Sequence, residues 1–157
     1  MEEYIQPFIE GTEEVFRDLC NTEIKASRPY FVSKDEFETI WDVSGIIGLS
    51  GEANGAVAIS IKEVTAFKLT SILTGKEYTS VDREVTDMLG EVINIIAGNV
   101  KNVFEKKHRV KISIPSIIKG KAHTIVWPSE KARIICIPFT IFNDQELCLS
   151  VAVEEAK

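Results

Sequence analysis

The longest run of regularly spaced hydrophobic residues predicts a helix from about residue 81 to residue 107. Its apolar side chains recur every three or four residues on one face: Val85, Leu89, Val92, Ile96, Val100 and Val103. Ser80 or Asp82 is suited to begin this helix as its N-cap. About 27 residues make a rod of roughly 40 Å, more than a small core needs. We therefore predict that this helix is the spine of the fold.

Two shorter helices are predicted earlier in the chain. Residues 4–19 carry apolar side chains at near-helical spacing, and Pro7 is tolerable in a first turn. Residues 64–74 predict a second helix, which Gly75 would end as a left-handed cap.

Alternating apolar residues predict two β-hairpins. The first joins residues 40–49, with Trp41, Val43, Ile47 and Leu49 on one face, to residues 56–61 through a turn at 50–55. Its second arm points Val57, Ile59 and Ile61 to the core, and the small side chains Ala56, Ala58 and Ser60 face away, where they could lie against another surface.

The second predicted hairpin comes from residues 133–142 and 145–153, which turn at Asn143-Asp144. Before it, residues 111–114 predict a strand ended by Pro115, followed by a loop that contains Trp127-Pro128. The order helix-then-hairpin thus occurs twice. We predict an α+β fold in which helices pack on one antiparallel sheet with pseudo-two-fold symmetry.

A faint sequence echo supports the repeat. An offset of 88 residues aligns Val15-Phe16 with Val103-Phe104, and it sets Glu3 and Gln6 opposite Glu91 and Asn94.

Composition narrows the class of protein. The 157 residues, 45% of them hydrophobic, fit a single domain over residues 1–157. The net charge of −6 argues against a nucleic-acid or anionic-membrane surface. The short basic runs at 106–109 and 119–121 are interpreted as a complement to the helix C-terminus and as a solvated loop. Neither a signal peptide nor a membrane-spanning run is recognisable, so we expect a cytoplasmic protein.

The three cysteines, Cys20, Cys136 and Cys148, have no metal-type spacing. If Phe142 pairs with Gln145, strand alternation puts Cys136 and Cys148 on opposite faces of the sheet. These two would then be buried thiols, consistent with a reducing compartment.

Several catalytic templates do not fit. His108 and His123 lack the spacing of a zinc protease, and no serine or cysteine nucleophile signature occurs. The glycine-rich segment 44–51 lacks the ending of a phosphate loop, so its glycines are attributed to bulges or close backbone packing. We therefore expect no metal or cofactor of the protein's own.

One polar stripe on the long helix holds candidate chemistry. Asp87, Glu91 and Asn94 lie three or four residues apart, on the face away from the apolar residues. Asp87 and Glu91 share one solvated face, which does not suit a carboxylate acid-base pair. Gly90 and Gly98 each cost about 1 kcal/mol in a helix relative to Ala. They indicate either a bare surface for a partner or close packing within the fold.

The segment 87–99, Asp-Met-Leu-Gly-Glu-Val-Ile-Asn-Ile-Ile-Ala-Gly-Asn, resembles the signature helix of the CheC/CheX/FliY chemotaxis phosphatases. The CheX branch is the most similar, because residues 42–51 and 55–60 and the chain length also match it. The resemblance implies that Asn94 orients the water that attacks the aspartyl phosphate of a CheY-type response regulator, and that Glu91 pairs with the regulator's lysine. The Mg²⁺ would be the regulator's own.

The resemblance also bears on docking and assembly. Pro115 is taken as the counterpart of the family motif's proline, although it stands nearer to the Asn than in the family, and with Asp87, Gly90 and Gly98 it is assigned to partner docking. Gln6 replaces the family's amino-terminal Asn, which argues against a two-site enzyme. A homodimer formed by sheet extension is implied, with the hairpin edges as its candidate surface. The alternative function is a noncatalytic module that binds a receiver domain or a motor component.

Overall fold

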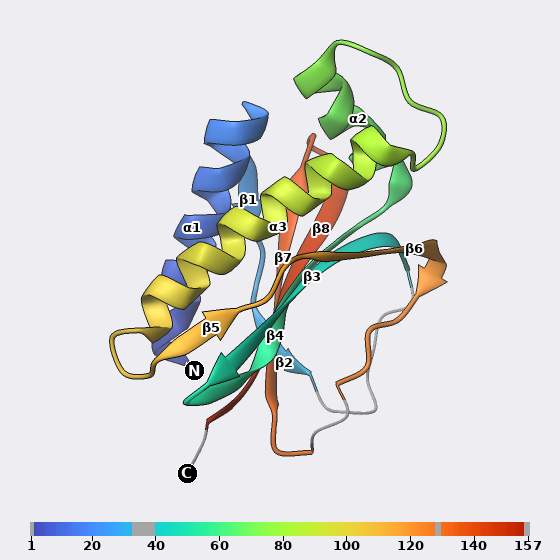
Figure 1. The fold of residues 1–157 in the computed structure, drawn as a ribbon. Helices are drawn as coiled ribbons and strands as arrows, with labels where there is room; N and C mark the ends of the chain where they lie inside the picture. The colour runs from blue at the N-terminus through green and yellow to red at the C-terminus, as the bar shows by residue number, and fades with distance from the viewer. Residues whose placement is uncertain (1, 33–39, 128–129, 156–157) are drawn as a thin grey trace.

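The computed structural model, over its described residues 2–32, 40–127 and 130–155, has three helices packed on one antiparallel sheet of eight strands. The elements are, in order, α1 (Glu2–Cys20), β1 (Ile24–Ala26), β2 (Tyr30–Val32), β3 (Trp41–Gly51), β4 (Ala53–Ile61), α2 (Glu63–Thr74), α3 (Arg83–Phe104), β5 (Val110–Ile112), β6 (Ser116–His123), β7 (Arg133–Ile141) and β8 (Gln145–Glu155). Figure 1 shows α1 and α3 side by side over one face of the sheet. The predicted α+β class is confirmed.

The fold repeats itself around a pseudo-two-fold axis, as predicted. The strand order is β1-β7-β8-β4-β3-β5, in which β2 also pairs with β7 and β6 with β3. Each half is therefore a helix, two edge strands and a hairpin, and its edge strands pair with the hairpin of the other half. The two hairpins meet along β4 and β8, with α2 connecting the halves.

The crossing of α1 and α3 marks the symmetry axis. The Asn99 side-chain amide donates to the backbone carbonyl of Gly11 at 3.4 Å, and these residues are separated by 88 positions. That separation equals the offset of the sequence echo, so equivalent positions of the two helices meet. Beside the crossing, the rings of Tyr4 and Phe104 pack edge to face with centroids 4.9 Å apart.

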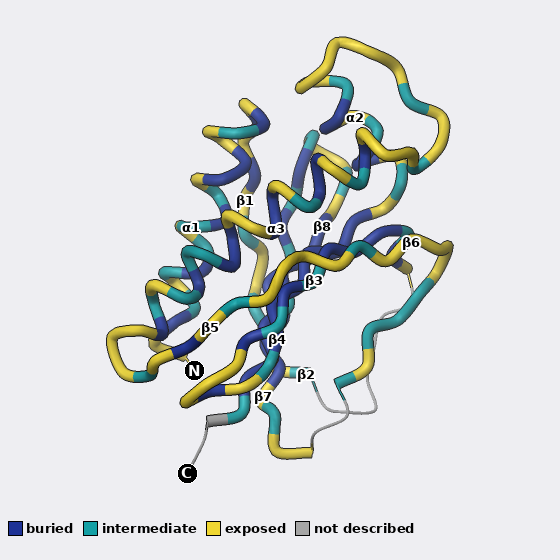
Figure 2. The backbone as a smooth tube through the Cα atoms, in the orientation of Figure 1, coloured by how far each residue is buried: buried dark blue, intermediate teal, exposed yellow. Residues whose placement is uncertain are grey.

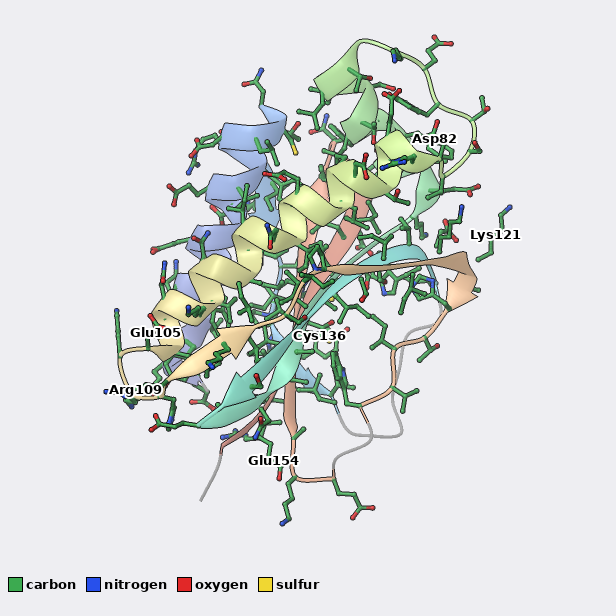
Figure 3. The ribbon with its side chains drawn as sticks, in the orientation of Figure 1. Asp82, Glu105, Arg109, Lys121, Cys136 and Glu154 are labelled. Carbon is green, nitrogen blue, oxygen red and sulfur yellow. The ribbon has the colours of Figure 1, made fainter. Side chains whose placement is uncertain are left out.

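Helix α3 is capped at its start and anchored along its underside. The Asp82 carboxylate accepts from the Val85 backbone N–H at 3.2 Å, which selects Asp82 as the N-cap. In Figure 3, Asp82 and Glu105 mark the two ends of the helix. The helix is shorter than predicted: it ends at Phe104, before the basic run at 106–109. A Cβ on Gly45 of β3 would lie 3.1 Å from Ile93, so this glycine admits α3 close to the sheet.

The predicted hairpins form, but three strands were missed. Strands β1 and β2 are three residues long, and β6 lies where residues 119–121 were interpreted as a loop. Strands β1 and β2 form one edge of the sheet and β5 and β6 the other, and the hairpin strands lie in its interior. The expectation that hairpin edges are available for sheet extension is therefore wrong. Pro128 of the predicted loop lies outside the described residues.

The cysteine prediction is partly wrong. All three thiols are free and buried, but Cys136 and Cys148 lie on the same face and share a cluster with Trp41. The hairpin turns through three residues because Ile141, not Phe142, pairs with Gln145. Positive φ angles at Phe142 and Asn143 make this turn.

Trp41 also differs from the prediction. Trp41 lies on the face away from the helices, in the cluster of Cys136 and Cys148, at a place where the pairing of β3 with β6 is irregular between residues 41 and 43. At the other end of the chain, α1 begins at Glu2, so Pro7 lies in the second turn instead of the first.

Within the described residues, no helix is both long enough and apolar enough to cross a membrane.

Candidate functional site on helix α3

The outer face of α3 is the candidate site. Asp87, Glu91 and Asn94 are exposed, whereas the apolar residues that were predicted to face the core are buried, except for half-buried Val103. Figure 2 shows this alternation of exposed and buried positions along the helix. The predicted stripe therefore forms, on a rod held by the sheet below.

The polar groups of this face are available to another molecule. Within the ranges that the structure describes, the side chains of Glu91 and Asn94 have no hydrogen bond or ion pair. Asp87 has only a loose ion pair, with its carboxylate 3.9 Å from Arg83 and both side chains largely exposed. Such a pair contributes little to stability.

The two glycines differ in their surroundings. A Cβ on Gly98 would meet nothing within 4 Å, so packing inside the chain does not account for this glycine. A Cβ on Gly90 would lie 3.9 Å from Ile117 of β6, which is ordinary contact. The surface around Asn94 is therefore bare on the side of Gly98 and bordered by β6 on the side of Gly90.

Pro115 lies apart from the helix, in the connection between β5 and β6, and is exposed. Both strands contact α3, and Figure 1 shows the connection passing beside the middle of the helix. Two exposed apolar side chains near this surface were missed by the sequence analysis, Ile95 on α3 and Ile114 next to Pro115.

The arrangement suits positioning better than covalent catalysis. A carboxylate and an amide, one turn apart, can accept from a cation and orient water. The stripe contains no serine, threonine or cysteine to serve as a hydroxyl or thiol nucleophile. The residues that the structure describes contain no group of three or more His, Cys, Asp or Glu arranged to hold a metal.

The equivalent face of α1 is occupied by its own contacts. Glu3, the counterpart of Glu91, accepts from the Lys107 ammonium at 2.7 Å, and this contact lowers the pKa of the Glu3 carboxyl. Gln6, the counterpart of Asn94, donates to Glu10 at 3.2 Å.

A small cavity of about 50 Å³ lies on the sheet face away from the helices. Trp41, Trp127, His123, Cys136 and Cys148 are among the side chains that line it. His123 is hydrogen-bonded to the Ser44 hydroxyl at 2.7 Å. The cavity is on the opposite face of the sheet from α3 and includes none of the predicted site residues.

The matching family model and a curated relative name the same protein family. The model of the chemotaxis phosphatase CheX matches residues 43–140. The CheY-P phosphatase CheX of Thermotoga maritima is 27% identical over 153 residues, covering 96% of this chain and 95% of its own.

Two crystal structures extend the likeness to the fold. Chemotaxis protein CheX from Vibrio vulnificus is 29% identical with a TM-score of 0.85, over 97% of this chain and 99% of its own. The CheX of a CheX–CheY–BeF₃–Mg²⁺ complex from Borrelia burgdorferi is 30% identical with a TM-score of 0.78, over 97% of this chain and 98% of its own. The family match covers more than half of the chain and includes α3 with all of its stripe. The chain therefore belongs to the family of the chemotaxis phosphatase CheX.

Proposed function

We propose that this protein hydrolyses the aspartyl phosphate of a CheY-type response regulator that docks on α3. The observation that carries the proposal is the pair Glu91 and Asn94, exposed and without partners among the described side chains, on a helix of a CheX-family chain that is anchored by its buried face. The Thermotoga relative named as a CheY-P phosphatase and the Borrelia complex of a CheX with a CheY support the choice of substrate.

The proposed mechanism assigns separate roles to the two residues. An acyl phosphate is already activated, so catalysis mainly requires water held in line with the phosphorus. The Asn94 amide suits this role because it can donate to and accept from water while uncharged. Glu91 would pair with the regulator's lysine. Mg²⁺ would enter with the regulator, in keeping with the ion in the Borrelia complex.

The decisive experiment follows the decay of a phosphorylated, Mg²⁺-bound CheY-type receiver with catalytic amounts of protein. Asn94→Ala should lower the accelerated rate by about 10²–10³, which is typical for one positioned polar group. Asn102→Ala is the matched control, because Asn102 is an exposed amide on the same helix about 12 Å away. Binding without acceleration by the wild type would favour the noncatalytic docking module.

The same proposal includes a single domain and a homodimer in the cytoplasm. Among the described strands, β1–β2 and β5–β6 form the two edges of the sheet, and either edge could extend the sheet between copies. Light scattering of the full chain tests this assembly, and a monomer at all concentrations would contradict it.

A further inference from the structure

The connection between β5 and β6 is a β-bulge that turns one apolar side chain outward. Against β3, the two residues Ile114 and Pro115 stand opposite the single residue Ile47. Ser113, just before the bulge, is fixed by two hydrogen bonds with the Gly48 backbone, of 3.0 and 2.8 Å. The bulge is therefore a built feature of the edge.

The other half of the molecule has the same bulge. Arg28 and Pro29 stand opposite the single residue Ile137, and the Ser27 N–H donates to the Pro138 carbonyl at 2.8 Å. Residues 27–29 and 113–115 both have the sequence Ser-X-Pro. The repeated backbone follows from the pseudo-symmetry and by itself indicates no function. The residue before the proline, however, differs between the halves: it is Arg28 in one bulge and Ile114 in the other.

The β5–β6 bulge passes beside the turn of α3 that carries Asn94. At one end of this edge, Ile117 of β6 lies next to Gly90 of α3, because a Cβ on Gly90 would be 3.9 Å from the Ile117 side chain. Towards the other end, Lys101 of α3 and Val110 of β5 line the same open pocket. The bulge lies about midway between these two points along the edge, and Asn94 lies between them along the helix.

The side chain of Ile114 projects on the side of the sheet that carries the helices. Opposite residues of antiparallel strands share a face, and Ile47 points into the core below the helices. Ile114 is nevertheless 84% exposed, the highest value among the large hydrophobic side chains that the structure describes. A lone exposed hydrophobe is ordinary on a protein surface. One that follows a hydrogen-bonded residue, beside the proposed docking face, is suited to burial by the partner.

We propose that Ile114 is a docking anchor that packs against the receiver domain when that domain engages α3, and so contributes to the affinity for the receiver. The inference rests on the proposed function and extends the α3 surface to the neighbouring sheet edge. The counterpart half supports it, because there an exposed Arg28 occupies the same bulge beside a helix with Gln6 in place of Asn. The apolar residue Ile114 is thus found in the half of the molecule that carries Asn94, the proposed water-positioning amide.

Ile114→Ser and the matched Arg28→Ser variant test the proposal in the full-length protein. KM and kcat are measured on the phosphorylated receiver, and Kd on a receiver loaded with beryllofluoride and Mg²⁺. Loss of one buried aliphatic side chain should raise KM and Kd about tenfold for Ile114→Ser. The kcat should stay within about twofold because the water-positioning group is untouched. Arg28→Ser should match the wild type.

The outcomes separate this inference from the proposed function. Wild-type acceleration with unchanged KM and Kd for Ile114→Ser would overturn the anchor alone. Wild-type binding without acceleration would overturn the phosphatase, yet Kd would still decide the anchor. Absence of both binding and acceleration would overturn both proposals. If Ile114→Ser changed the oligomeric state and left the Kd unchanged, Ile114 would belong to an interface between copies of the chain, and the anchor would be overturned.

Discussion

At the scale of single residues, charge separates the roles proposed for Glu91 and Asn94. Both are exposed on the same face of α3, and only Glu91 can form an ion pair with a partner. An ion pair across a docking interface speeds association and weakens as salt screens it. An uncharged amide that positions water has no such dependence. The two side chains should therefore be distinguishable by ionic strength.

Glu91→Gln should weaken receiver binding several-fold at low salt, with the difference from the wild type shrinking as salt is raised towards 1 M. The reason is that the Debye length falls from about 10 Å at 0.1 M to about 3 Å at 1 M. Titration of a beryllofluoride-loaded receiver at several salt concentrations checks this, with Asn94→Ala beside it. A constant ratio of Kd values across all salt concentrations would contradict the ion pair.

A second prediction at this scale concerns a buried thiol. Burial raises the pKa of Cys20 to about 11 from an ordinary 9.0. The unfolded chain therefore loses this proton first, so the stabilising contribution is full below pH 9 and is lost as pH rises towards 11. The free energy of unfolding should fall by about 1 kcal/mol more between pH 8 and pH 10 than in Cys20→Ala. Parallel urea titrations of the two proteins measure the difference, and identical slopes with pH would refute it.

At the scale of elements, α3 carries a glycine that its own fold does not need. Gly98→Ala should raise the free energy of unfolding by up to about 1 kcal/mol, because Ala is the better helix former and its Cβ meets nothing within 4 Å. If the bare surface serves docking, the same change should raise KM for the receiver. Denaturant unfolding and steady-state kinetics measure the two effects.

Gly75→Ala is the control for that substitution. Gly75 ends α2 with φ of 74°, a conformation that Ala adopts poorly, so this variant should be less stable and keep its KM. A stabilised Gly98→Ala with unchanged KM would leave the glycine without a docking role.

The elements also show what a single sequence can predict. Helices α1 to α3 and both hairpins were found because their apolar residues repeat with a clear period. Strand β6 was missed because its residues are mostly exposed, so backbone pairing with β3 holds it without a hydrophobic pattern. The predicted face of Cys148 was wrong because one extra residue in the turn moves every later side chain of the strand to the opposite face of the sheet.

The candidate site was predicted differently. Spacing alone put Asp87, Glu91 and Asn94 on one face, and only the resemblance to a family gave them roles. Ile114 escaped because the sequence was interpreted as a strand through that position. The repeated Ser-X-Pro was the available signal, but it acquires meaning only when both copies are seen to form the same bulge.

At the scale of the whole molecule, a symmetric backbone carries asymmetric surfaces. The halves share their order of elements, their bulges and a helix crossing at equivalent residues. On the α1 side, Glu3 is bound by Lys107, Gln6 stands in place of Asn94, and Arg28 puts a cation at the bulge. A cation there would oppose a receiver's lysine. The symmetry thus repeats the scaffold, whereas the Glu–Asn pair proposed as the site is not repeated on α1.

One receiver should therefore bind per chain. Calorimetric titration with a beryllofluoride-loaded receiver should give a stoichiometry of one per chain, and Gln6→Ala should leave both this number and the rate of receiver decay unchanged. Asn94→Ala should preserve the stoichiometry while abolishing acceleration, because the amide acts on water more than on docking. A stoichiometry of two per chain, or slower decay with Gln6→Ala, would show that α1 holds a second working site in spite of the Glu3–Lys107 contact.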